Sequence, residues 1–313
     1  MHEKLITDRA RITQRVRDFF TDNNFLEVET PIMVDIPGME PHLTPFETTD
    51  GKFLNHSPEL QMKKLLGQGL KRIFNITKVF RSGEKSNTHN PEFTMLEWYR
   101  LNADYKDMMT DCENLITSLT DKYSKPFKRK TCQELFQEHL QIDLTSDNFA
   151  EEAAKHIDVS QLKTWDEIFF KLFLNFIEPN LGPEPIFVTD YPASQAALAK
   201  TKGFFAERFE LYINGLELAN AFSELTDATE QRHRLEEEQE ERRQMNKTVF
   251  PIDEEFLSAL DSIPEAAGIA LGLDRLIMVL LDKKTIQEVI LFSGAAQHIS
   301  SKASPSHSNT APG

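Results

Sequence analysis

The sequence has few cysteines, no long apolar run and no secretory start. Cys112 and Cys132 are the only cysteines in 313 residues. They lack metal-ligand spacing and are too few for a disulfide framework. No stretch approaches the roughly 18 apolar residues of a membrane span, and the charged, amphipathic N-terminus differs from a signal peptide. We therefore expect a cytoplasmic protein with reduced thiols, no structural zinc site and no membrane contact.

Positive charge is scarce as well. The chain has 35 Lys and Arg against 50 Asp and Glu, which gives a formal net charge of −15. Because nucleic-acid-binding domains usually carry a basic footprint, extended contact with RNA is disfavoured. The sequence also has no Walker A loop, no dinucleotide-binding glycine motif, no nucleophile elbow and no His-Glu-x-x-His pair. A bound nucleotide would have to be held by other means.

Hydrophobic periodicity predicts an α+β fold, an antiparallel sheet flanked by helices. Residues 3–24 have helical spacing, and residues 25–33 follow as a strand interrupted by Pro31. A second amphipathic helix is predicted at 57–66. From 105 to about 178 the pattern is mainly helical, which indicates a helical insertion.

The other predicted elements alternate irregularly, so a doubly wound parallel sheet is not indicated. They are a strand at 185–190, a hairpin at 208–222 that turns at Asn214-Gly215, a charged helix at about 227–246, and a strand and helix at 268–281.

Two further predicted strands, residues 72–82 and 93–101, enclose a long charged loop of the kind that is often functional. Four residues in and beside this loop offer donors for phosphate and an aromatic stacking face: Arg81, His89, Asn90 and Phe93. Together they are suited to a ligand with both a phosphate and an aromatic base. For Arg81 and Phe93 taken alone, a surface cation and a core aromatic are equally good interpretations.

The 208–222 hairpin suggests a second half of the same site. Cross-strand pairing places Glu210 and Glu217 on one face. Two close carboxylates favour a cation, and Mg²⁺ bridging to phosphates needs only one or two protein carboxylates; two acids on a solvated face are the alternative. Asn220 and Glu224 are out of phase with Glu217, so a β-bulge would be needed to join them to this site.

Two other positions are ambiguous from the sequence. Arg275 lies early in the helix that follows Gly272, near a helix N-terminus, where a cation is disfavoured unless an anion or an aromatic face is present. An ordinary ion pair is the alternative. Trp98 should lie on the opposite face of its strand from Glu97 and Tyr99, and we expect it in the core.

Three segments, in this order, resemble the three motifs of class II aminoacyl-tRNA synthetases: FLEVETPIM, VFRSGEKSNTHNPEF and GIALGLDRL. HNPEFTMLEWY and ELANAFSELTDATEQ are similar to the lysyl branch, and the match extends to about Ser293. Within that branch the chain most resembles the short lysyl-tRNA synthetase paralogues that attach lysine or β-lysine to elongation factor P. The resemblance implies a class II catalytic domain over 1–298, with an insertion at about 105–178 and a disordered tail at 299–313.

The resemblance also implies a role for each site residue, with Arg81 and Arg275 catalytic. ATP would be bound by Arg81, Ser82, Gly83, Glu84, His89, Asn90, Phe93, Glu217, Leu218, Gly272 and Arg275. Lysine or β-lysine would be bound by Ser57, Pro58, Glu59, Glu97, Tyr99, Asn220, Glu224 and Ala270. Mg²⁺ would be bound by Glu210 and Glu217.

Within these sets, the family assigns particular contacts. Arg81 would hold the α-phosphate and the amino-acid carboxylate, and His89 a terminal phosphate. Phe93 and Arg275 would sandwich the adenine, and Glu224 would receive the side-chain ammonium. The chain departs from the family at two places: Ser-Gly-Glu follows Arg81 instead of Asn-Glu, and alanine stands at 221 where the branch usually has glycine.

Two features favour the paralogues over a tRNA synthetase. The first motif begins at residue 25 and leaves no room before it for an anticodon-binding domain. Ala270 stands where the synthetases have glycine, and one methyl at a pocket wall discriminates between substrates by roughly 1 to 3 kcal/mol; simple packing is the alternative.

The function implied is an ATP- and Mg²⁺-dependent ligase. It would form an adenylate of (R)-β-lysine or lysine and transfer the aminoacyl group to a lysine of elongation factor P, as a homodimer and without tRNA. The alternatives are a truncated lysyl-tRNA synthetase and a non-catalytic paralogue that binds a nucleotide or an amino acid.

Overall fold

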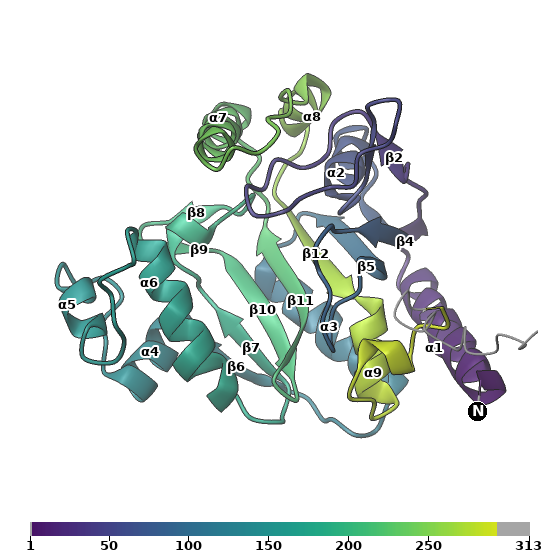
Figure 1. Ribbon diagram of the computed structural model, residues 1–313. Helices are drawn as coiled ribbons and strands as arrows, with labels where there is room; N and C mark the ends of the chain where they lie inside the picture. Colours follow the sequence, from purple (N-terminus) through teal and green to yellow (C-terminus); the bar gives the residue numbers. More distant parts are fainter. Residues whose placement is uncertain (1, 293–313) are drawn as a thin grey trace, which may run out of the picture.

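The computed structural model describes residues 2–292, in which one large sheet is surrounded by helices (Figure 1). Its eight strands run in the order β1-β4-β5-β12-β11-β10-β7-β6. Their bounds are β1 (Leu26–Glu27), β4 (Arg72–Phe80), β5 (Glu92–Leu101), β6 (Lys128–Thr131), β7 (Ile186–Thr189), β10 (Arg208–Ile213), β11 (Leu216–Ser223) and β12 (Ala266–Gly272). All neighbours pair antiparallel except the two edge strands, since β1 runs parallel to β4 and β6 parallel to β7. The predicted α+β class is confirmed.

The α-helices in the described range are α1 (His2–Asp22), α2 (Glu59–Gly67), α3 (Tyr105–Leu119), α4 (Cys132–Leu140), α5 (Phe149–Ala153), α6 (Trp165–Leu172), α7 (Ala228–Gln244), α8 (Glu254–Leu260) and α9 (Leu273–Leu280). Capping boxes begin three of them, at Asp104, Thr131 and Thr164. Helices α2, α7 and α8 lie together at one end of the sheet, and α4 to α6 lie beside the β6 edge (Figure 1).

The remaining elements are short. They are the strand pairs β2 (Met33–Val34) with β3 (Phe53–Leu54) and β8 (Thr201–Lys202) with β9 (Phe205–Ala206), and the single turns η1 (Phe173–Ile177), η2 (Glu178–Asn180), η3 (Ala193–Gln195) and η4 (Ile286–Glu288). The predicted strand at 25–33 is therefore wrong as one element. It is divided into β1 and β2, because Pro31 between them cannot donate to a strand ladder.

The insertion is also not purely helical. Residues 128–131 form β6, an edge strand of sequence KRKT whose lack of apolar residues hides it from a periodicity analysis. Helix α3 packs through Met108, Cys112 and Leu115 in the main core rather than in the insertion. The other helices of this region surround a separate core with Phe136 and Phe169 stacked 5.1 Å apart.

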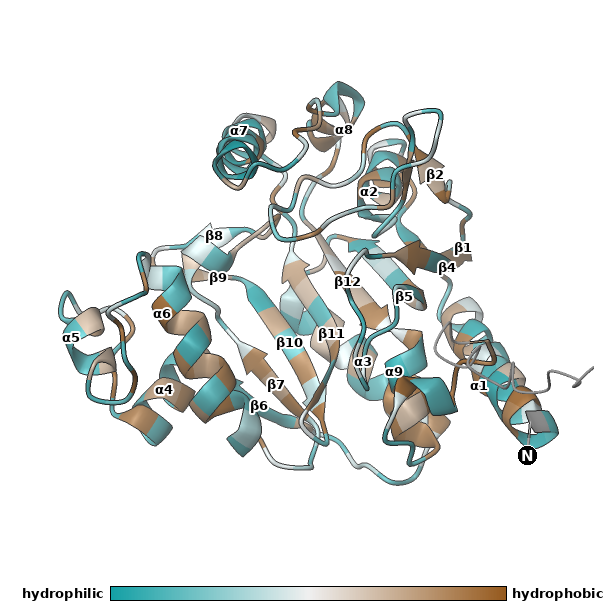
Figure 2. Cartoon of the chain, viewed as in Figure 1, coloured by the Kyte–Doolittle hydropathy of each residue, from teal (hydrophilic) through white to brown (hydrophobic). Residues whose placement is uncertain are grey.

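One face of the sheet forms the main core. Trp98 is fully buried there, as predicted, and its ring lies 5.0 Å from that of Phe20 on α1. Figure 2 shows the resulting alternation of polar and apolar positions along the central strands. Because strand residues alternate between faces, the polar neighbours of the core residues project toward the other face.

The hairpin of β10 and β11 contains the expected bulge. Asn214 and Gly215 have φ of 56° and 68°, as a tight hairpin turn requires. Leu211 pairs with Ala219 while Tyr212 pairs with Glu217, so one extra residue lies on β11. Because of this extra residue, the side chains of Glu217 and Asn220 lie on the same face of the sheet although the two positions are three residues apart.

Within the described range, no helix combines the length and apolarity needed to cross a membrane. Cys112 and Cys132 are both buried and unbridged. The tail predicted at 299–313 lies outside the described residues.

Candidate active site

The polar face of the sheet carries functional side chains in two cross-strand rows. Asn220 on β11 pairs with Ala270 on β12, which pairs with Glu97 on β5. In the next row, Gly268 pairs with Tyr99. Residues far apart in the sequence therefore share one floor because of strand register alone.

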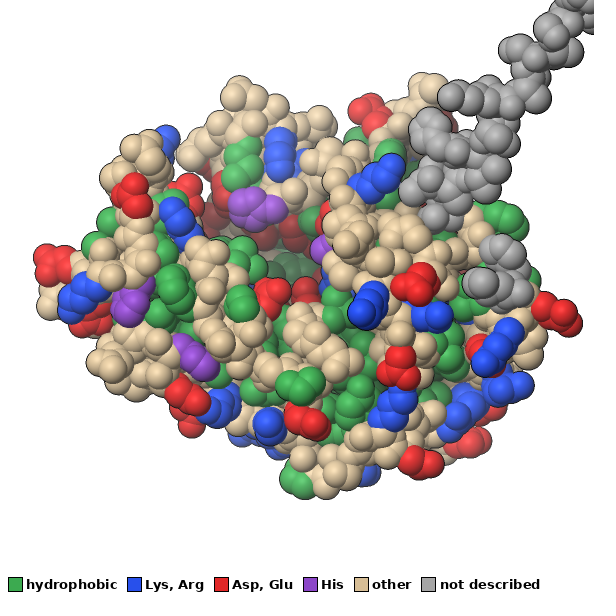
Figure 3. Space-filling model, turned by 60° about the horizontal axis from the view of Figure 1, so that its bottom comes forward, with side chains coloured by type: hydrophobic (Ala, Val, Ile, Leu, Met, Phe, Trp, Pro, Cys, Tyr) green, Lys and Arg blue, Asp and Glu red, His purple; other side chains and the backbone are tan. Residues whose placement is uncertain are grey.

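A cavity of about 430 Å³ lies over this floor, which is within the usual range for small-molecule sites. Figure 3 shows one face of the molecule hollowed, with acidic side chains gathered at the hollow. Of the predicted site residues, the cavity is lined by Ser57, Glu59, Arg81, Glu84, His89, Asn90, Phe93, Tyr99, Glu217, Leu218, Asn220, Ala270, Gly272 and Arg275. Those outside its lining are Pro58, Ser82, Gly83, Glu97, Glu210 and Glu224.

Three of the residues outside the lining shape the backbone. The Ser82 N–H donates to the Thr44 carbonyl at 2.9 Å. Gly83 has a φ of 84°, a conformation that favours glycine. Pro58 is the residue before the first turn of α2. The Ser-Gly-Glu departure therefore forms a turn that leaves Glu84 facing the cavity, 3.9 Å from the Arg81 guanidinium.

One end of the cavity is rich in arginine. The Arg81 guanidinium lies over the Phe93 ring at 5.4 Å. Arg275 donates to the Glu217 carbonyl at 2.8 Å and has a nitrogen 2.7 Å from His89 Nε2. Phe93 therefore has the Arg81 guanidinium over its ring, and Arg275 lines the same cavity. The adenine sandwich between Phe93 and Arg275 stays a prediction.

His89 is neutral near pH 7. Burial lowers its pKa, and the Arg275 guanidinium lowers it further. Because arginine only donates, Nε2 accepts from Arg275, and the ring proton lies on Nδ1, 2.8 Å from Ser86 Oγ. The ring is thus held between the loop and α9, and a phosphate oxygen could bind at Nε2 only if that nitrogen carried a proton.

The two acids predicted to bind magnesium differ in this structure. Glu217 lines the cavity, and burial together with the Glu210 charge raises its pKa to about 7. Glu210 is satisfied by the protein: Arg208 donates to Oε1 at 2.6 Å, and Tyr191 and Tyr212 each donate to Oε2 at 2.6 Å. Glu217 faces the cavity with the Arg275 guanidinium 3.6 Å from its Oε2, so a cation bound there would share this carboxylate with Arg275.

Within residues 2–292, no group of three or more His, Cys, Asp and Glu side chains is arranged to hold a metal ion alone. Magnesium bound mainly through phosphates needs only one or two protein carboxylates. The donor set at Glu217 fits that mode of binding.

The other end of the cavity is acidic. Glu97 is buried and accepts from Ser57 Oγ at 2.6 Å and Tyr99 Oη at 3.0 Å. Burial and the nearby Glu59 raise its pKa to about 8. A ligand with a positive charge beside Glu97 would lower this pKa again and favour the ionised carboxylate.

A lysine that the sequence analysis missed lies between two of these acids. Lys63 Nζ is 2.6 Å from Glu59 Oε1 and forms an ion pair with Glu224, and the lysine side chain is buried. Glu224 Oε1 keeps no hydrogen-bond partner. The predicted ammonium receptor thus already holds one internal ammonium. Glu59 and Lys63 are four residues apart on α2, a spacing that predicts an ion pair from the sequence. Such pairs are usually exposed, so the spacing alone does not indicate a buried lysine in the site.

Gly268 was also missed. A Cβ at this position would lie 2.1 Å from the Tyr99 ring and 2.4 Å from Glu224 Oε1. Because Gly268 lines the cavity, the absence of a side chain there leaves room for the Tyr99 ring and Glu224 Oε1 close to its backbone.

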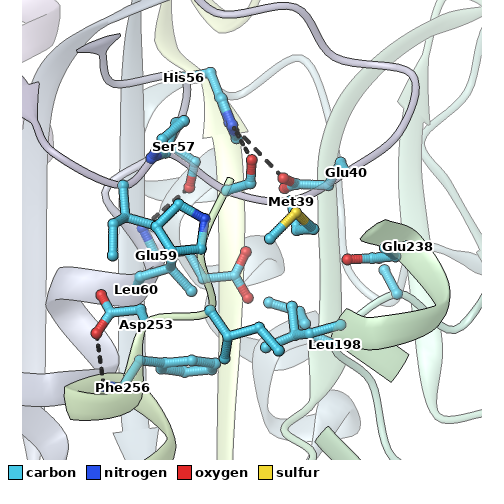
Figure 4. Close-up of a pocket in the computed structure, with 17 residues that line it drawn as sticks. Met39, Glu40, His56, Ser57, Glu59, Leu60, Leu198, Glu238, Asp253 and Phe256 are labelled. Atoms are coloured by element: carbon cyan, nitrogen blue, oxygen red, sulfur yellow. Dashed lines mark hydrogen bonds and ion pairs between the residues drawn. The ribbon is translucent and has the colours of Figure 1, made fainter. Parts of the chain in front are cut away.

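A smaller cavity of about 30 Å³, room for a water molecule or two, adjoins the acidic end (Figure 4). It shares Ser57 and Glu59 with the large cavity. Glu40 and Glu238 also line it, and burial followed by the Glu40 charge raises the pKa of Glu238 to about 8. Carboxyl groups therefore continue past the floor of the site, and Glu238 is mostly protonated near pH 7.

Comparison with known proteins agrees with this geometry. Residues 1–296 match the family model of class II tRNA synthetases (D, K and N). The chain is 41% identical over 302 residues to the elongation factor P--(R)-beta-lysine ligase of Pasteurella multocida strain Pm70, which covers 91% of this chain and 93% of the relative. It is 40% identical over 308 residues to the ligase of the same name from Haemophilus influenzae strain PittGG, covering 93% and 95%.

A ligase of that name from Salmonella paratyphi B is 40% identical over 305 residues, covering 91% of this chain and 93% of the relative. The family match includes every predicted site residue. The chain belongs to the class II tRNA synthetase family of the D, K and N enzymes.

Proposed function

We propose that the chain is an ATP-dependent ligase that activates (R)-β-lysine or lysine as an adenylate and transfers it to a lysine side chain of elongation factor P. The family match and the ligase names of relatives at about 40% identity support this assignment. The observation that carries it is a single cavity lined by Arg81, Arg275 and Phe93 at one end and by Glu59 at the other, with the buried Glu97 and Glu224 next to Glu59.

The arginine end suits a nucleotide. Arg81, Arg275 and Phe93 line the cavity, where the arginines would stabilise negative charge that develops at the α-phosphate and Phe93 would offer a face for the base. Mg²⁺ would be held by phosphates and by Glu217, and it would neutralise phosphate charge there. Catalysis then consists mainly of positioning the amino-acid carboxylate for in-line attack, which requires no covalent enzyme intermediate.

The acidic end suits a diamino acid. Glu59 and Glu224 each keep one oxygen that is not bound to Lys63, and Glu97 adds a third carboxyl group. Together these groups select a substrate with a terminal ammonium. Ala270 lies in the row between Asn220 and Glu97, and its methyl group would contact the carbon that carries the second amino group.

ATP–pyrophosphate exchange tests the activation step. The wild-type protein should exchange pyrophosphate with lysine or (R)-β-lysine and not with norleucine, which has no terminal ammonium. Arg81→Ala should abolish the exchange while the thermal unfolding temperature stays near that of the wild type. Exchange at a normal rate in Arg81→Ala would remove the nucleotide assignment.

The remaining expectations are part of the same proposal. We expect a homodimer in the cytoplasm, no requirement for tRNA, and elongation factor P as the acceptor. A tRNA-charging enzyme is the competing function, and transfer to tRNA in place of the protein would favour it.

A further inference from the structure

A largely buried arginine on β10, Arg208, fixes the orientation of the Asn220 side chain. Arg208 Nε donates to Asn220 Oδ1 at 3.0 Å. Arginine has donors only, so the amide oxygen must face Arg208 and the NH₂ group must point elsewhere. Asn220 lines the large cavity. The NH₂ group is therefore the part of this side chain that is available to a ligand.

The Arg208 guanidinium is itself held on several sides. It donates to Glu210 Oε1 at 2.6 Å and to the Gln195 carbonyl, and it lies over the Tyr191 ring at 4.6 Å. Only 12% of its side chain is exposed. A guanidinium with this many partners has little rotational freedom, so the Asn220 amide bound to it is also fixed.

We propose that Arg208 is a positioning residue that presents the Asn220 NH₂ group to the carboxylate of the amino-acid substrate. A carboxylate offers only acceptors, so it binds the NH₂ group and is repelled by the amide oxygen. Without Arg208 the amide is free to turn its oxygen into the cavity. This inference depends on the proposed function, because that function supplies the amino-acid substrate.

The variant Asn220→Asp tests the role of the Asn220 NH₂ group without removing the contact with Arg208. Aspartate keeps an acceptor for Arg208, so the unfolding temperature should equal or exceed that of the wild type. The second carboxylate oxygen would replace the NH₂ group and repel the substrate. We expect the KM for lysine or β-lysine in pyrophosphate exchange to rise at least tenfold, with less than a twofold change in the KM for ATP. An unchanged amino-acid KM would overturn the inference.

A double-mutant cycle tests whether Arg208 acts through Asn220. Arg208→Lys keeps a positive charge beside Glu210 but loses the planar fork that also reaches Asn220. It should raise the amino-acid KM at least tenfold in the wild-type background and less than twofold in the Asn220→Ala background. Equal effects in both backgrounds would mean that Arg208 acts independently and would contradict the proposal.

Arg100→Lys is the matched control. Arg100 lies on β5, pairs with Asp111 at 3.0 Å and is not part of the cavity lining. This variant should leave both KM values unchanged. If the wild-type protein exchanges pyrophosphate with no lysine isomer, the proposed function fails and this inference fails with it. If the wild type does exchange pyrophosphate, but the effects of Arg208→Lys and Asn220→Ala on the amino-acid KM are additive, only the inference about Arg208 is contradicted.

Discussion

At the residue scale, Glu97 is a carboxyl group whose charge changes within the working pH range. Its pKa is raised to about 8 by burial and by Glu59. An ionised carboxylate attracts a substrate ammonium, so the KM for lysine should fall as pH rises from 6 to 8, by up to about tenfold per unit if one proton must leave. Steady-state exchange assays at several pH values measure this. Glu97→Gln should flatten the dependence, and an equally steep profile in that variant would exclude Glu97 as its source.

Ala270 is the residue where isomer choice should be decided. It lines the cavity between Asn220 and Glu97. Ala270→Gly removes one methyl from the wall and should shift the ratio of kcat/KM toward α-lysine by up to about tenfold, or about 1.4 kcal/mol. The ratio for the two isomers is the measurement. If it does not change, Ala270 has only a packing role.

At the element scale, adjacent residues of β5 should differ in what their loss does. Trp98 is fully buried in the main core, so Trp98→Ala should lower the free energy of unfolding by about 3 to 5 kcal/mol. Tyr99 lies on the cavity face and donates to Glu97. Tyr99→Phe should leave stability nearly unchanged and raise the amino-acid KM. Urea unfolding and exchange kinetics of both variants check this, and a reversed pattern would mean that the strand faces are assigned wrongly.

Several elements were predictable because their signals are local. The Asn214-Gly215 turn fixes the register of its hairpin, and from that register the need for a bulge before Asn220 followed by counting. The strand β6 carries no apolar periodicity, since it is an exposed edge. Lys63 has the spacing of an ordinary surface ion pair, and only the tertiary fold brings Glu224 to it.

The sequence predicted which residues line the cavity better than it predicted which side chains contact one another there. The motifs brought Arg81, Phe93 and Arg275 to one cavity, as expected. Which arginine lies over Phe93 depends on side-chain partners such as His89 and the Glu217 carbonyl. Those partners come from the assembled sheet, and no sequence spacing specifies them.

At the scale of the whole molecule, buried acids couple stability to pH. Glu97 and Glu238 have pKa values raised to about 8, and Glu217 has one raised to about 7, each mainly by burial. A raised folded pKa favours the protonated folded state, so this stability is full below the ordinary value of about 4.5 and is lost as pH rises through 7 to 8. The unfolding temperature should therefore fall between pH 6 and 9.

Ligands should reduce that loss of stability. ATP with Mg²⁺ and lysine bring positive charge to Glu217 and to the acidic end of the cavity, so their stabilising effect should be larger at pH 8.5 than at pH 6.5. Thermal unfolding with and without these ligands at both values measures the difference. A ligand effect that is the same at both pH values would contradict the placement of these acids at the site.

Acceptor identity tests the central claim most directly. The purified protein is incubated with ATP, Mg²⁺ and (R)-β-lysine, together with either elongation factor P or tRNA, and intact masses are measured; Arg81→Ala serves as the inactive control. We predict that elongation factor P gains the mass of one amino acid less water, on a lysine residue, and that tRNA gains nothing. Aminoacylated tRNA beside unmodified elongation factor P would contradict the account.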